Sequence, residues 1–301
     1  MSRRGWLVFA AVSILWGIPY LLIKVAVDDG VPPGFVAWAR VVIAAAVLLG
    51  LAARAGALRG LRGRWKWLAV FALTETAIPF PLIASGERRV SSSVTAILIA
   101  ATPLIAALLA LRFDRSERLD TRRLTGLILG VGGVVALVGV DIRGRPDELV
   151  GALEILIAAV FYAVGPMVLK RHLTHLDPRA SMGACLALAA LMLTPLAALR
   201  PPAALPSARA IAALFGLGLL CTAAAFVLYV VLITEAGATR SLVVTYVNPV
   251  VAVLLGMLLL RERPGAGAYA GMALILVGSW LATMRTEPRP ESRSETVAKD
   301  P

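Results

Sequence analysis

The chain has 301 residues, of which 59% are hydrophobic and 16% are charged, and its mean hydropathy is +0.84. A soluble domain carries about a quarter charged residues, so this composition excludes an ordinary soluble protein and indicates that lipid surrounds most of the chain. The net charge of +12 lies mostly in short segments between apolar runs, which is typical of membrane proteins and argues against nucleic acid as a partner.

Apolar runs follow one another along the chain, and each approaches the roughly 20 residues that a helix needs to cross the hydrocarbon core. We therefore expect an all-α membrane protein with ten transmembrane helices, at 6–27, 34–53, 67–85, 93–111, 124–140, 149–169, 180–199, 211–233, 241–260 and 266–284. Short connections with glycine and proline separate the runs, as at residues 28–34. Segment 285–301, rich in proline, glutamate and serine, is predicted to be a disordered cytoplasmic tail.

The distribution of basic residues predicts the orientation of these helices. Most of the 30 lysines and arginines fall in segments that are cytoplasmic if the N-terminus is cytoplasmic, including clusters within 54–66 and 112–123. We therefore predict a multi-pass protein of the cell (inner) membrane, with the lipid bilayer as its partner and both termini in the cytoplasm.

The two halves of the sequence are similar to each other. One fixed offset places Thr102-Pro103 on Asn248-Pro249, and matching glycines and Glu-Arg pairs follow. We expect a duplication, with a first five-helix repeat in residues 1–141 and a second in residues 149–284. Because five is an odd number, the second repeat is inverted in the membrane, which is an arrangement typical of secondary transporters.

A set of short motifs occurs in order along residues 6–284. They are Trp16-Gly17 with Lys24 and Arg40, the run from Val90 through Thr102-Pro103-Leu104, and Glu-Arg after the fourth and ninth spans. Together they resemble the EamA-type branch of the drug/metabolite transporter superfamily. The resemblance implies ten helices in inverted repeats, a central substrate cavity, and export or exchange of metabolites such as amino acids.

The second half departs from the first at polar positions. Arg40 meets Leu186 under the repeat offset, and Glu75 meets Cys221. Any polar site is therefore expected to be asymmetric between the halves.

Candidate cavity residues lie near the middle of the predicted spans, where transporter sites are usually found. They are Trp16, Glu75, Thr102, Pro103, Tyr162, Asn248 and Pro249. Each of the two prolines removes a backbone donor and frees a carbonyl one turn earlier, which a membrane tolerates only where protein or cavity water binds it. Equivalent breaks in both halves favour a lined cavity, and the alternative is a tolerated packing kink.

Three ionisable residues within the predicted spans are candidates for function. An ionised carboxylate at the bilayer centre costs about 2.5–3.5 kcal/mol, so Glu75 must be protonated, paired or facing water. We expect Glu75 to be a candidate proton-coupling group, with a structural hydrogen bond as the alternative. Lys24 and Arg40 are candidates for a vestibule that attracts an anionic group such as a carboxylate. Their alternative is to snorkel to the interface or to pair with Asp28 or Asp29.

Glycine spacing predicts close helix contacts at the end of each half. Gly126 and Gly130 lie four residues apart in the fifth span, and Gly267 and Gly271 do so in the tenth. These spans are expected to provide packing support, joined either between halves or between protomers.

The sequence contains no motif for a cofactor, a metal or a catalytic centre. Cys185 and Cys221 lie in apolar runs without CxxC spacing or histidine neighbours, and no GxxxxGK[ST] phosphate loop occurs. We therefore predict a secondary-active transporter of a small molecule, which is not an enzyme, uses no cofactor, and has protons as its candidate coupling ion. A channel or a flippase for a lipid-linked substrate is the alternative, and the sequence leaves substrate, direction and oligomeric state open.

Overall fold

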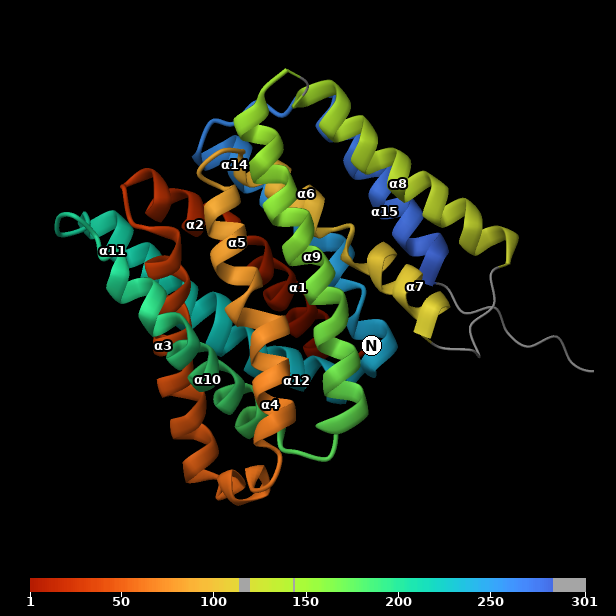
Figure 1. The fold of residues 1–301 in the computed structure, drawn as a ribbon. Coiled ribbons are helices and arrows are strands. Elements are labelled where there is room, and N and C mark those ends of the chain that lie inside the picture. The colour runs from red at the N-terminus through yellow and green to blue at the C-terminus, as the bar shows by residue number, and fades with distance from the viewer. Residues whose placement is uncertain (114–119, 143, 284–301) are drawn as a thin grey trace, which may run out of the picture.

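The computed structural model describes residues 1–113, 120–142 and 144–283, and every regular element in these ranges is a helix (Figure 1). The first half contains α1 Arg3–Gly17, α2 Pro19–Asp28, α3 Pro33–Arg54, η1 Ala57–Leu61, α4 Trp65–Ala72, η2 Leu73–Ala77, α5 Pro79–Gly86, α6 Ser92–Ile99, α7 Thr102–Phe113 and α8 Thr121–Asp141. The second half contains α9 Pro146–His172, α10 Pro178–Leu199, α11 Ala208–Phe215, η3 Gly216–Ala224, α12 Ala225–Ala236, α13 Ala238–Ser241, α14 Val244–Leu259 and α15 Ala266–Thr283. The predicted tail 285–301 lies outside the described residues.

Nine helical segments of the described chain are long and apolar enough to cross a membrane. They are Arg3–Asp28, Pro33–Arg54, Trp65–Gly86, Ser92–Leu111, Thr121–Asp141, Pro146–His172, Pro178–Leu199, Ala208–Ala236 and Ala266–Thr283. A further apolar helix, α14, is shorter, at 16 residues. The prediction of an all-α membrane protein is confirmed, and each predicted helix coincides with one of these segments.

The ninth predicted helix, 241–260, is shortened at its start. The chain turns between α13 and α14, where Val243 N donates to Arg240 O at 3.2 Å and Thr245 N donates to Leu242 O at 3.0 Å. These bonds span three residues instead of four, so the turn is tighter than an α-helix. The regular helix therefore begins only at Val244.

Prolines interrupt the first, third and fourth spans. Pro19 and Pro79 each begin a new helical segment, α2 and α5. Pro103 cannot donate to the carbonyl of Ile99, and the Thr102 hydroxyl donates to this freed oxygen instead, at 2.7 Å. The break between α6 and α7 is therefore satisfied locally by a side chain.

The third and eighth spans each contain a π-helical segment, η2 and η3. In η2, Ile78 N donates to Leu73 O at 3.1 Å, five residues earlier, and the Thr76 hydroxyl donates to Ala72 O at 2.8 Å. In η3, the Thr222 hydroxyl donates to Leu217 O at 2.8 Å. Threonine hydroxyls thus bind carbonyls of both widened turns, and such π segments occur frequently at functional sites.

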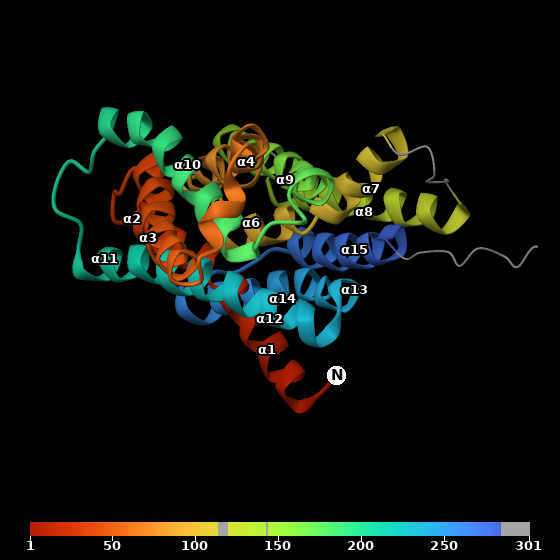
Figure 2. The same cartoon turned by 90° about the horizontal axis from the view of Figure 1, so that it is seen from below.

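Helices α8 and α15 lie side by side in both views (Figures 1 and 2). Glycines bring their backbones together, because a Cβ on Gly126 would lie 2.6 Å from Ala282 N and one on Gly278 would lie 2.5 Å from Gly126 O. The glycine-rich faces of the fifth and tenth spans therefore pack together within one chain.

Polar contacts fasten this helix pair at both ends. Asp141 accepts hydrogen bonds from Gly267 N and Ala268 N, at 3.1 and 2.7 Å, at the first turn of α15. At the other end, Arg123 Nε donates to Ala282 O at 3.1 Å. The negative Asp141 binds the N-terminus of α15 and the positive Arg123 binds its C-terminus, so each charge is opposite to the helix dipole at that end.

Replacing Gly278 with valine is expected to lower the melting temperature of the purified protein by several degrees. The added side chain would strike backbone atoms that cannot rotate away, and overpacking of this kind costs typically 1–3 kcal/mol. Gly132→Val on α8 is the matched control, because its Cβ meets nothing within 4 Å. Thermal unfolding in detergent measures both variants, and equal melting temperatures would contradict the close backbone contact.

A second long helix pair, α3 with α10, forms the core of the other side of the bundle. Small and aliphatic residues fill it, including Ala44, Leu48, Cys185 and Leu186. Gly183 brings α10 so close that a Cβ there would lie 3.1 Å from Leu49 N. This packing fixes α3, which carries Arg40, against the second half of the chain.

Candidate functional site

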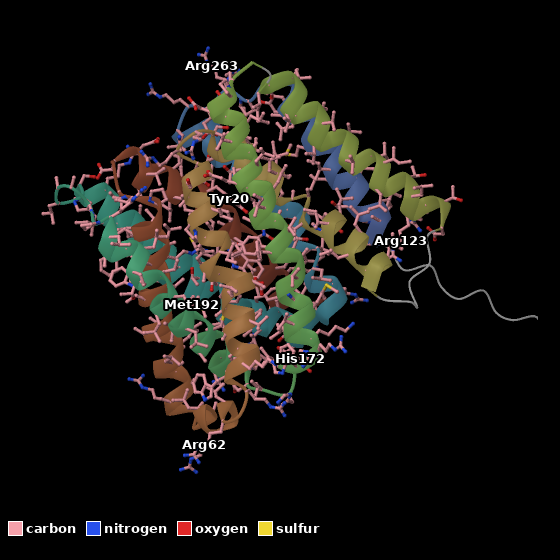
Figure 3. All side chains as sticks on the ribbon, viewed as in Figure 1. Tyr20, Arg62, Arg123, His172, Met192 and Arg263 are labelled. Carbon is pink, nitrogen blue, oxygen red and sulfur yellow. The ribbon has the colours of Figure 1, made fainter. Side chains whose placement is uncertain are left out.

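The two ends of the bundle are named here after residues labelled in Figure 3. The Arg263 end is where α5 ends and α6 begins, and the Arg62 end is where α3 ends and α4 begins. Figure 3 shows Tyr20 between the two ends.

Glu75 lies in η2, in the middle of the third span, and its carboxylate faces α9. Its Oε2 atom is buried and has no hydrogen-bond partner among the described residues. The carboxylate contacts Gly165 so closely that a Cβ on this glycine would overlap Oε2. Tyr162 and Tyr229 are close enough to interact with it electrostatically. Glycine at position 165 therefore makes the space that the Glu75 carboxylate occupies.

Arg40 lies in the second turn of α3, and only 8% of the residue is exposed. Its Nε donates to the Thr222 hydroxyl in η3 at 2.8 Å, and its guanidinium carbon lies 4.0 Å from the centre of the Phe80 ring. Within the described ranges it forms no ion pair, and its two terminal nitrogens have no recorded hydrogen bond. A buried guanidinium with free donors suits an anionic partner.

Tyr162 of α9 connects these two ionisable residues. It interacts electrostatically with both Arg40 and Glu75, and its ring packs against two separate core clusters. Arg40 and Glu75 do not form a salt bridge with each other. The interior thus holds a positive and a negative group, from the second and third spans, with a tyrosine near both.

Helix α1, which carries Trp16, crosses α14 at Asn248. A Cβ on Gly17 would lie 2.5 Å from Val251, so the two helices touch there. With its amide oriented to donate, Asn248 bonds the Ser13 and Val244 carbonyl oxygens at 3.2 and 2.9 Å. This amide binds backbone groups, and Pro249 beside it is buried within α14.

An aromatic cluster extends from this crossing toward Glu75. The Trp16 ring lies 5.8 Å from Phe226 and 4.7 Å from Tyr229, measured between ring centres. Tyr229 is also an electrostatic neighbour of Glu75. Tyr229 of the second half therefore contacts Trp16 of the first half and lies within electrostatic range of Glu75.

Thr102 and Pro103 lie beside a different set of residues. Besides the Thr102 bond to Ile99, the Ala100 carbonyl accepts a hydrogen bond from Ser279 of α15 at 3.3 Å. A Cβ on Gly130 of α8 would overlap the Leu104 side chain. This break therefore faces the α8 and α15 pair.

Lys24 lies at the Arg263 end with its charge engaged. Its Nζ is 3.2 Å from the Asp28 carboxylate and donates to the backbone oxygen of Glu87 at 2.8 Å. Asp29 accepts a hydrogen bond from Ser207 N at 2.9 Å, at the start of α11. Of the alternatives for Lys24, pairing with Asp28 is the one that this conformation contains.

Sequence reasoning missed the direct partners of both central residues. Thr222 and Phe80 hold Arg40, and Gly165 makes room for Glu75. Gly165-Pro166 within a predicted span was a signal for the last contact. Thr222, as a midspan hydroxyl, gave only a weak signal.

Two apolar cavities, of about 470 and 310 Å³, lie elsewhere, between α8 and the start of α9. Val138, Gly139 and Leu149 line both of them, and none of the candidate residues does. In a membrane, lipid chains can fill such grooves. The candidate site is therefore the set of side chains around Arg40 and Glu75.

Comparisons with known proteins agree with this architecture. The model of the EamA-like transporter family matches residues 3–139 and, separately, residues 149–284. The uncharacterized inner membrane transporter YedA of Escherichia coli (strain K12) is 30% identical over 282 residues, covering 91% of this chain and 89% of that protein. The uncharacterized transporter YoaV of Bacillus subtilis (strain 168) is 24% identical, covering 91% and 94%. A solved structure described as "Crystal structure of protein" has a TM-score of 0.66 and 23% identity over 94% of this chain and 98% of its own, and so has the same fold.

Proposed function

The chain belongs to the EamA-like transporter family, and on that basis we propose that it is a secondary-active transporter that exports or exchanges a small metabolite, such as an amino acid, by alternating access. It is a multi-pass membrane protein, as its apolar helices and its transporter relatives indicate. The substrate, the direction and the coupling ion are part of the proposal.

The proposal includes an inverted duplication of residues 1–141 and 149–284. Three features support it: the separate matches of the family model to the two halves, the π-helical segments in the third and eighth spans, and the pairing of α3 with α10 and α8 with α15. Helices at equivalent positions of two such repeats meet each other near a pseudo-twofold axis, and an inverted duplication would therefore account for these pairings. Inverted repeats allow the halves to exchange conformations and so to alternate access.

Cysteine labelling is expected to place the loop within residues 112–123 in the cytoplasm and the loop at Arg261 outside. The positive-inside rule and the odd number of helices in each repeat both require this result. Cys185 and Cys221 are buried and are replaced by alanine first. Labelling of both loops from the same side would contradict the inverted repeat. Under this orientation the Arg263 end faces outward.

The observation that carries the proposed site is the pair of buried, opposite charges that do not bind each other. Arg40 offers its free terminal nitrogens to a carboxylate, and Glu75 offers its unpartnered oxygen to an ammonium group. Tyr162 lies near both, and Trp16 with Tyr229 provides an aromatic wall. A small zwitterion would satisfy both charges at once, which neither can do in this conformation.

The same geometry supports coupling to protons through Glu75. A buried carboxylate without a partner is stable when it binds a proton or a cationic group. A proton and the ammonium group of the substrate would therefore compete for Glu75. Competition at one carboxylate produces exchange, in which a proton enters as a substrate molecule leaves.

Counterflow into proteoliposomes tests the proposed function. Vesicles loaded with an unlabelled neutral amino acid should accumulate its labelled form above the external concentration, without any gradient of protons. Non-saturable uptake would indicate the channel alternative. Flipping of a labelled lipid-linked sugar without amino-acid counterflow would indicate the flippase alternative, for which the apolar grooves between α8 and α9 would be the lateral entry.

A further inference from the structure

Glu87 follows the third span directly and, among the described residues, is the most completely buried carboxylate outside the candidate site. None of the residue is exposed to solvent. Both carboxylate oxygens are buried and lack a hydrogen-bond partner within the part of the chain that the structure describes. A glutamate at a helix end usually faces water. The complete burial of Glu87 without a hydrogen-bond partner is therefore unusual and calls for an explanation.

Five ionisable groups face Glu87, from two helices and from the segment after α14. Tyr20, Lys24 and Asp28 belong to α2, Arg40 belongs to α3, and Glu262 follows α14. Lys24 binds the Asp28 carboxylate and the backbone oxygen of Glu87, and Arg40 binds Thr222 through its Nε. No cation therefore binds the Glu87 carboxylate directly among the described residues.

The second half of the chain closes this end of the bundle. Glu262 accepts hydrogen bonds from Ser92 N at 2.8 Å, Ser93 N at 3.0 Å and Ser93 Oγ at 2.5 Å, and so caps α6 of the first half. Gly256 permits the approach, because a Cβ there would lie 2.6 Å from Glu262 Oε2 and 3.0 Å from Ser92 Oγ. Glu262 of the second half thus binds the first turn of α6, the helix that follows Glu87.

Two other contacts join the halves at the Arg263 end. Arg89 pairs with Glu154 at 2.9 Å, and Asp29 accepts from Ser207 N at 2.9 Å. This end is therefore closed in the conformation described. Opening it during alternating access would separate these contacts and admit water to Glu87.

We infer that Glu87 is a proton-binding site of the gate at the Arg263 end, which takes a proton from the adjoining solvent as this end closes and returns it as the end opens. The inference rests on the proposed alternating access, and the site is distinct from Glu75. In the closed state, burial raises the pKa of Glu87 well above its usual range, and Glu262 and Asp28 add to this while Lys24 and Arg40 oppose it. In the open state, water restores an ordinary pKa, near 4.3 for glutamate.

The sign of the pH effect follows from this difference. The closed state binds one proton more than the open state at any pH between the two pKa values, so acid favours closure. Within that window, the ratio of closed to open molecules changes by up to about tenfold for each pH unit. Above the raised pKa, closure requires burial of an uncompensated charge, and the open state is favoured.

Distance measurements between two spin labels test the inference in the full-length protein in lipid nanodiscs. The labels replace Arg88 and Arg263, which are exposed and lie in different halves, after Cys185 and Cys221 are changed to alanine. The short-distance population is expected to grow as the pH falls from 9 to 5. Glu87→Gln should stay closed and vary less than about twofold over that range, and Glu87→Asp should retain the pH dependence.

Glu148→Gln is the matched control, because it removes the same charge near the same end of the bundle. Glu148 lies in the first turn of α9 and pairs at 2.6 Å with Arg145, the N-cap residue of that helix. This variant should behave like the parent protein. If both distances occur but the ratio of their populations does not change with pH, the role of Glu87 is overturned. The same holds if the Glu87→Gln variant shows the pH dependence of the parent protein. Either result would leave alternating access intact. A single distance under all conditions, with and without amino acid, would overturn alternating access as well.

Discussion

Arg40→Met should reduce counterflow by about 10- to 150-fold while leaving the protein as stable as the parent, or more stable. A hydrogen bond to a charged group contributes about 1.5–3 kcal/mol, which corresponds to this loss in affinity for a substrate carboxylate. The desolvated guanidinium has no carboxylate partner among the described side chains, so its removal costs the fold little. A functional arginine gives this combination, whereas a structural one would lower stability together with transport.

Counterflow and thermal unfolding on the same preparations measure the two quantities. Arg59→Met is the control, because Arg59 is exposed in η1 at the other end of the bundle. The counterflow activity of Arg40→Lys should lie between those of the parent and the methionine variant. Lysine keeps the positive charge but lacks the guanidinium donors that bind Thr222 and the substrate at the same time. A melting temperature that falls in proportion to activity would contradict the proposed role of Arg40.

Glu75→Gln is expected to abolish transport driven by a proton gradient and to leave counterflow measurable. Glutamine resembles the protonated carboxyl group, so the site can no longer exchange a proton for the substrate ammonium. The loss of the charge should also raise the KM for counterflow, by roughly tenfold for an interaction of about 1.4 kcal/mol. Glu235→Gln is the control, because Glu235 is exposed and pairs with Arg4 at 3.5 Å.

Uptake with and without an imposed gradient separates the two effects. A Glu75→Gln variant that still responds fully to the gradient would leave this residue with a structural role. Loss of both activities with normal folding would instead assign Glu75 to substrate binding without coupling.

The fold could be predicted from the sequence because each membrane span is a contiguous run of apolar residues. Apolar length placed the helices, and Pro103 correctly marked an interruption of the fourth span. The equivalent break expected at Pro249 was wrong, because α14 continues from Val244 to Leu259 with this proline inside it. The π-helical segment η3 could not be predicted, since residues 216–224 contain no proline and the helix that packs against it, α3, is distant in the sequence. Hydrophobic periodicity does not distinguish a π-turn from an α-turn.

The site was predictable only in part. Glu75 and Arg40 stand out because ionisable residues in an apolar span are rare. The contact of Arg40 with Thr222, which is 182 residues away, depends on how α3 docks against the second half. The burial of Glu87 could not be predicted, because in the sequence it follows a predicted span and resembles an exposed loop residue. It is buried in the folded chain, where Glu262 from the second half binds the start of α6.

The most direct test of the central claim is a binding measurement on the purified protein with three related ligands. Isothermal titration compares the neutral amino acid that supports counterflow with its methyl ester and with its analogue that lacks the amino group. If Arg40 and Glu75 hold opposite ends of a zwitterion, each analogue should bind at least about tenfold more weakly, because each loses one charge-assisted contact. In Arg40→Met the ester should bind as well as the amino acid, because the carboxylate no longer has a partner. Equal affinities of the parent protein for all three ligands would contradict a site built on these two charges.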